Sequence, residues 1–135
     1  MPIRFSETMA GTLRGQDGGE HAISFTVTAS DEGRGMFRLA GTTSAAPWVH
    51  DAPSTGVLVL RPRYLRYRVR FAGPGGDWII AGEKLPRLHA PIRTMTVLPV
   101  QVHDAVGTLQ ASGNLRFSLR DLPGFAWSWA TGWRA

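Results

Sequence analysis

The chain has 135 residues, of which 43% are hydrophobic and 19% are charged, and 15 basic against 10 acidic residues give a formal net charge of +5. This length fits a single domain over residues 1–135 with one core, and the absence of cysteine excludes a disulfide framework or a thiol nucleophile. No apolar run approaches the roughly 18 residues of a membrane span, and the amino terminus lacks a signal-peptide pattern, so we expect a cytoplasmic protein that does not span a membrane.

The first predicted element is a β-hairpin. Residues 3–13 alternate between apolar and polar side chains, with Glu7 standing on the otherwise apolar face, and this rhythm is typical of a half-buried strand. Turn residues follow at 16–19, and the alternation then resumes around Phe25. The two runs are therefore expected to pair.

A short third strand is expected over residues 36–40, after a polar break at 31–35. The following segment, residues 41–55, contains small residues and two prolines and has no sustained period. It is therefore predicted to be a long loop, and unstructured loops of this length often carry function.

The strongest strand signal lies at the centre of the chain. Residues 64–71 alternate apolar side chains with Arg66, Arg68 and Arg70, and the turn residues at 72–77 predict a hairpin with the next strand. The other strands expected in this half of the chain cover residues 56–60, 78–85, 92–100 and 107–119. Gly113 is expected to mark a bend or bulge in the last of them. The tryptophans of the tail, residues 121–133, are expected to plug one end of the fold.

Together these elements predict an all-β fold with eight or nine strands and no convincing helix. Because the strands follow one another through short turns, we favour a single antiparallel β-barrel of the lipocalin or calycin type. A β-sandwich is the alternative.

Several segments resemble the small β-rich module found beside, or fused to, cholesterol-oxidase-like flavin oxidoreductases of the GMC class in bacteria. The segments that carry the resemblance, spread along most of the chain, are residues 5–11, 25–28, 65–68, 82–84, 94–97 and 113–117. The flavin-binding Gly-x-Gly-x-x-Gly turn is absent. The resemblance therefore implies an accessory calycin-like barrel near lipid or sterol metabolism, without oxidase activity or a cofactor of its own.

Two opposite charges fall on faces that are predicted to point inward. Glu7 is in register with Phe5, and Lys84 is in register with Trp78, so the two could form an internal salt bridge. In the leading hypothesis this pair orients an apolar small molecule, such as a lipid or sterol, inside the barrel. The residues expected to line that site are Phe5, Glu7, Phe25, Tyr67, Trp78, Lys84 and Phe117. Alternatively, the pair only fixes the strand register, or Glu7 serves an enzyme as acid or base.

Arg66, Arg68 and Arg70 form a stripe on one side of a strand, and Arg61 and Arg63 join it at the adjoining turn. Such a stripe is most often a solvated face whose arginines have acidic partners across the neighbouring strands. The second hypothesis is that the stripe and the 41–55 loop dock the module onto an oxidoreductase. Nucleic acid is not favoured, because Tyr67 points away from the arginines and because 14 arginines with a single lysine are typical of a GC-rich genome.

The histidines give no further site. They are scattered along the chain without the spacing of a metal site, and no nucleophile elbow accompanies them. They are His21, His50, His89 and His103. The sequence therefore predicts neither a metal centre nor a catalytic residue set.

Overall fold

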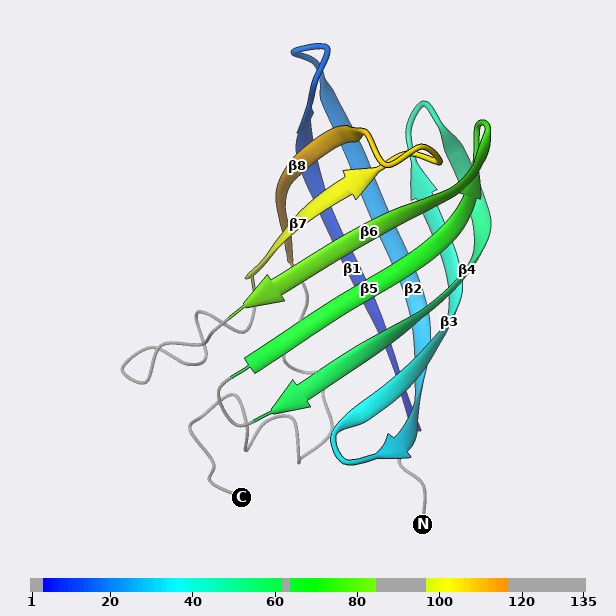
Figure 1. The fold of residues 1–135 in the computed structure, drawn as a ribbon, viewed down its shortest axis with the longest axis vertical. Coiled ribbons are helices and arrows are strands. Elements are labelled where there is room, and N and C mark those ends of the chain that lie inside the picture. Colours follow the sequence, from blue (N-terminus) through cyan, green and yellow to red (C-terminus); the bar gives the residue numbers. More distant parts are fainter. Residues whose placement is uncertain (1–3, 62–63, 85–96, 117–135) are drawn as a thin grey trace.

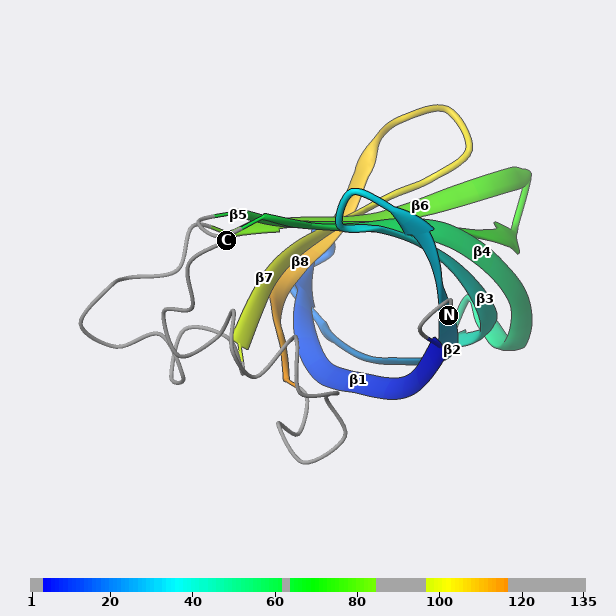
Figure 2. The same cartoon turned by 90° about the horizontal axis from the view of Figure 1, so that it is seen from below.

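The computed structural model describes residues 4–61, 64–84 and 97–116, and these residues form eight strands without any helix. The strands are β1 (Arg4–Gly15), β2 (Glu20–Gly33), β3 (Met36–Ala45), β4 (Val49–Arg61), β5 (Tyr64–Gly73), β6 (Gly76–Lys84), β7 (Val97–His103) and β8 (Leu109–Arg116). Each strand pairs antiparallel with the next (Figure 1). β8 pairs back onto β1, so the sheet closes into a barrel. Figure 2 shows this barrel from below, where the strands surround a central space that the ribbon leaves open.

The pairing of β1 with β8 confirms the predicted barrel and rules out the sandwich for the described strands. It runs from Ala10 opposite Arg116 to Gly15 opposite Ala111. In a sandwich of two sheets these strands would leave edges unpaired. Closure instead satisfies their backbone hydrogen bonds within the barrel.

The interior is filled according to the period of two. Along β5 the side chains of Leu65, Tyr67, Val69 and Phe71 are buried, whereas the three arginines between them are exposed. The same alternation governs β2, where Phe25 is 1% exposed. Each large apolar side chain removed from water in this way contributes about 1.5–3 kcal/mol. Because the buried residues of each strand point to the inside of the barrel, the core lies along the barrel axis.

The predicted loop over residues 41–55 is wrong. β3 continues to Ala45 and β4 begins at Val49, so only residues 46–48 form a turn between the two strands. The expected strand over 36–40 is thus the first half of a ten-residue strand.

Small inward-facing side chains explain why this region lacked a recognisable alternation. Thr43, Ala45, Ala52 and Ser54 are all buried, and none of them carries the bulky apolar signal on which pattern reading depends. The hydroxyls of Thr43 and Ser54 lie 2.7 Å apart across β3 and β4. Nearby, a Cβ on Gly41 would lie 1.9 Å from the Thr26 carbonyl oxygen, so the backbones approach here as only glycine permits.

Of the bend or bulge expected at Gly113, the bulge is not present. Gly113 pairs regularly with Leu13 of β1, and the register shift of the β7–β8 pair lies between Val102 and His103. A Cβ at Gly113 would lie 2.8 Å from Leu13 Cδ2, so glycine is needed here for close packing.

The other predicted strands agree with the structure where it describes them. The strand expected over 92–100 is described from Val97 and continues to His103. The tail expected to plug the barrel, residues 121–133, lies outside the described residues.

Candidate functional site

Three of the residues predicted to line the interior do face inward. Phe25, Tyr67 and Trp78 are 1%, 3% and 4% exposed. The rings of Phe25 and Tyr67 meet edge to face, with their centroids 6.0 Å apart. Trp78 packs on Phe71 and Trp48, at centroid distances of 6.1 and 4.9 Å. These residues therefore contact other aromatic side chains of the core.

The predicted pair of internal charges cannot be placed from the described side chains. Glu7 stands opposite Val27 in the β1–β2 register, and Lys84 stands opposite Leu65 in the β5–β6 register. The side chains of Phe5, Glu7 and Lys84, and the whole of Phe117, lie outside the described part of the structure. The salt bridge and a catalytic Glu7 both stay predictions.

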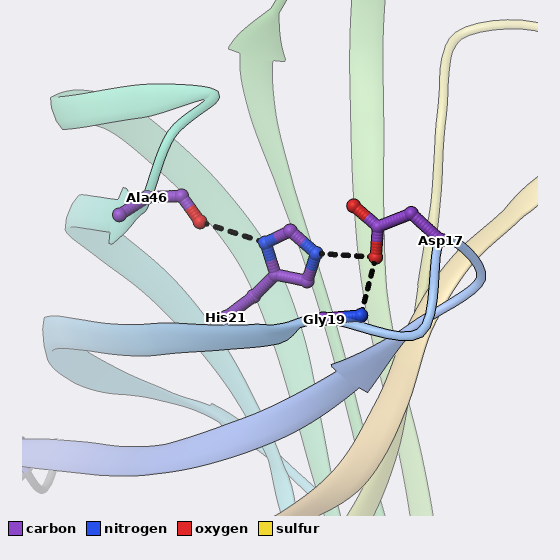
Figure 3. Close-up of polar contacts among 4 residues, drawn as sticks. All are labelled: Asp17, Gly19, His21 and Ala46. Atoms are coloured by element: carbon purple, nitrogen blue, oxygen red, sulfur yellow. Dashed lines mark hydrogen bonds and ion pairs between the residues drawn. The ribbon is translucent and has the colours of Figure 1, made fainter.

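One end of the barrel holds a polar cluster that the sequence analysis missed (Figure 3). His21 is 7% exposed and stacks on Trp48, with ring centroids 4.4 Å apart. Its Nδ1 lies 3.1 Å from the Ala46 carbonyl oxygen, and its Nε2 lies 3.3 Å from Asp17 Oδ1. The alternation of β2 could have predicted that His21 is buried, because His21 is in phase with Phe25 on the inward face of the strand.

The chemistry of this cluster is structural. Both ring nitrogens of His21 lie within hydrogen-bond distance of an oxygen atom. The Gly19 N–H, 2.8 Å from Asp17 Oδ1, and the His21 ring together lower the pKa of the Asp17 carboxyl. With both nitrogens engaged, His21 is not free to activate a nucleophile. It ties the β1–β2 turn to the β3–β4 turn.

On the outer wall, two of the three arginines of β5, Arg68 and Arg70, have no acidic partner among the described residues. Arg68 stands between Val57 of β4 and Ala81 of β6, and Arg70 stands between Thr55 and Ile79. Among the described residues, neither arginine forms an ion pair. The expectation of acidic cross-strand partners is therefore wrong for these two.

Arg66 is the exception. Its Nη2 lies 3.8 Å from Glu83 Oε2 on β6, and both side chains are about half exposed. Its guanidinium also lies 5.2 Å from the centroid of the Tyr64 ring. Two neighbouring groups therefore already hold Arg66.

Apolar side chains border this row of arginines. Met36 and Val57 are 40% and 41% exposed, and with Val106 of the β7–β8 turn they are the exposed large apolar residues of the described part of the chain. We use the name arginine face for the cationic residues and the larger apolar residues that point outward on the central part of β3–β6, namely Met36, Arg38, Val57, Val59, Arg66, Arg68, Arg70 and Ile79. Of these, Arg38 forms an ion pair with Glu32 at 2.8 Å. The arginine face thus combines cations with apolar surface.

A hollow of about 750 Å³ adjoins the arginine face and crosses the outer wall from β5 to β8. We call it the β5–β8 groove, and the outward residues that line it are Arg66, Arg68, Ala81, Glu83, Pro99, Gln101 and Ser112. A second hollow, of about 760 Å³, lies on the wall of β1–β3 beside Trp48 and His50. Unlike the first, it has no arginine or lysine in its lining.

The segment 41–55 offers less to a partner than the sequence suggested. Trp48 is half-buried and stacks on His21, so its ring closes the barrel end. His50 is exposed, and its Nε2 lies 3.3 Å from Asp51 Oδ2. Most residues of this segment therefore belong to the barrel strands β3 and β4 and do not form a separate docking loop.

Comparison of the chain with protein-family models, with curated proteins and with solved structures gave no match. The fold and the outer wall define the class as a closed eight-stranded antiparallel barrel with a cationic, partly apolar face. The resemblance to the module beside GMC oxidoreductases stays a prediction. In the described part of the chain, no helix is long and apolar enough to cross a membrane, and no three acidic or histidine side chains are grouped to hold a metal ion.

Proposed function

We propose that this barrel is a docking module that binds a partner protein through the arginine face. The observation that supports this most directly is that Arg68 and Arg70 have no acidic partner among the described residues and stand between apolar and hydroxyl side chains. On an ordinary solvated strand face, charges of both signs alternate across the strands. Unpaired arginine beside exposed apolar surface is instead the composition of protein interfaces.

Binding of a lipid or sterol inside the barrel, the leading hypothesis from the sequence, has less support. The interior residues proposed for it, Phe25, Tyr67 and Trp78, make ring contacts with each other or with neighbouring core aromatics. An eight-stranded barrel is just wide enough for side chains to fill it, or to hold one small ligand. The ring contacts among the described core residues support the first pattern.

The surface of the partner should be complementary to the arginine face. It would carry carboxylates opposite Arg68 and Arg70, and apolar side chains opposite Met36 and Val57. The resemblance described above makes a GMC-type flavin oxidoreductase the first partner to test.

The test is affinity purification of the tagged chain from its own organism, with the partner followed by flavin absorbance and mass spectrometry. Replacing Arg68→Glu together with Arg70→Glu should abolish recovery of the flavoprotein, because two attractions become repulsions. The matched control is Arg4→Glu with Arg116→Glu, which makes the same charge change at exposed residues of β1 and β8 that lie outside the arginine face and the lining of the β5–β8 groove. The control should recover as much flavoprotein as the unmodified chain.

Two results would count against the proposal. If the unmodified chain recovers no flavoprotein, the oxidoreductase is excluded as the partner. If the Arg68 and Arg70 variant recovers as much partner as the control, the arginine face is not the docking surface.

A further inference from the structure

We propose that the β5–β8 groove is a carboxylate-binding subsite, in which Arg68 anchors an acidic side chain from an extended segment of the partner protein. This inference rests on the proposed docking function. Beyond that function, the inference names carboxylates as the class of ligand and Arg68, one of three arginines on β5, as the residue that recognises them.

The first step of the argument separates the three arginines of β5. Arg66 and Arg68 line the groove, whereas Arg70 does not. Arg66 is already held by Glu83 and by the ring of Tyr64. Among the described residues, Arg68 is therefore the guanidinium that both faces the groove and lacks an acidic partner.

The second step concerns the residues across from Arg68. The strand register places Arg68 beside Ala81, Ala81 beside Gln101, and Gln101 beside Ser112. All of these except Arg68 are neutral. Between Arg68 and Arg14, which stands opposite Ser112 on β1, the row therefore presents a methyl group, a carboxamide and a hydroxyl.

The dimensions of this row suit a carboxylate. Two strand spacings, about 10 Å, separate the Cα atoms of Arg68 and Gln101, with only the small side chain of Ala81 between them. A carboxylate seated over Ala81 could accept a forked pair of hydrogen bonds from the guanidinium and one from the Gln101 carboxamide. Ser112 offers a further hydroxyl donor on the far side.

The lining favours a single carboxylate over a phosphate chain. Glu83 stands in the groove wall and repels additional negative charge, which weighs more against a row of phosphates than against one carboxylate. The aromatic ring next to Arg68 in sequence, that of Tyr67, is buried inside the barrel and cannot stack on a base. Exposed Val57, the β4 neighbour of Arg68, instead suits an apolar residue beside the acid.

The experiment titrates the full-length ¹⁵N-labelled chain with a blocked pentapeptide, Val-Glu-Val-Glu-Val, and follows backbone amide shifts by NMR. The amides of Ala81, Gln101 and Ser112 should shift in the titration. The same peptide with glutamine in place of glutamate should leave them unmoved. Inorganic phosphate, titrated separately, should bind more weakly than the glutamate peptide.

The matched variants are Arg68→Gln and Arg70→Gln, which remove the same charge from the same strand. Arg68→Gln should weaken peptide binding at least tenfold, whereas Arg70→Gln should change it less than threefold. Because both side chains are exposed, both variants should keep the amide spectrum of the folded barrel, which serves as the folding control.

Several results would overturn the subsite. These are equal weakening by the two variants, the absence of shifts at the three amides, or tighter binding of phosphate than of the peptide. Such a result leaves the docking face standing if the Arg68 and Arg70 charge reversal still abolishes partner recovery. Conversely, peptide binding at the groove without any partner recovery would separate the subsite from the docking function.

Discussion

The buried hydroxyl pair between β3 and β4 gives the sharpest test of the packing. Ser54 Oγ donates its single hydrogen to the Ala52 carbonyl oxygen at 2.9 Å. The hydrogen of the contact between the two hydroxyls, at 2.7 Å, must therefore come from Thr43. Since both side chains are at most 4% exposed, water cannot replace either partner.

Because Thr43 donates and Ser54 accepts, the two single substitutions should lower the free energy of unfolding by different amounts. Thr43→Val keeps the shape, removes one donor and leaves Ser54 bonded to Ala52, so it should cost about 1 kcal/mol. Ser54→Ala leaves the Thr43 hydroxyl buried without an acceptor, which should cost about 2 kcal/mol. The double variant contains no orphaned hydroxyl and should cost only about 1 kcal/mol, where additive effects would give about 3 kcal/mol.

Urea unfolding of the four proteins, followed by circular dichroism, measures this cycle. The expected coupling of about 2 kcal/mol lies well above the few tenths by which independent sites depart from additivity. If the two substitutions add, or if Thr43→Val costs more than Ser54→Ala, then the assigned direction of the hydrogen bond is refuted.

Three other predictions follow from the structure. The Gly19 N–H and the His21 ring lower the pKa of Asp17 below its ordinary value of 3.8. The ionised carboxyl therefore stabilises the fold above pH 3.8, and this stabilisation is lost as the pH falls through the lower pKa of the folded state. Asp17→Asn should reduce the loss of stability with acid, measured as the urea midpoint between about pH 5 and pH 2. Phe25→Ala should cost about 3–5 kcal/mol in the same assay, because it opens a cavity in the packed core, and a loss below 1 kcal/mol would indicate a loose interior. Gly41→Ala should lower the melting temperature sharply, since its Cβ would overlap the Thr26 carbonyl oxygen, and a wild-type melting curve would contradict that close approach.

The sequence predicted the strands whose inward residues are large, and it failed where they are small. Along β5, Leu65 and Phe71 alternate with arginine, and both the strand and its inward face are confirmed. Along β3 and β4 the inward positions include Thr43 and Ser54, which read as turn or loop residues until a partner strand is known. Their burial depends on the hydroxyl contact between two strands, and single-strand patterns contain no information about that contact.

The candidate site depended even more on pairing between strands. The outward stripe of Arg66, Arg68 and Arg70 could be read directly from the period of two. Which of these arginines has an acidic partner is set by the β5–β6 register, because a shift of two residues would bring Glu83 opposite Arg68 in place of Arg66. The groove likewise joins residues of four strands, so the pattern of any single strand could not indicate it.

Closure of the barrel restricts how this protein can recognise a partner. A sheet with a free edge can bind an extended segment by adding it as a strand, with main-chain hydrogen bonds supplying the affinity. Here β1, which would otherwise be an edge, is paired with β2 on one side and β8 on the other. Recognition along the described wall therefore falls to side chains, and the wall residues that combine charge, exposed apolar surface and a hollow are those around Arg68. For this reason the arginine face, more than the interior or any strand edge, is where loss of binding should be sought first.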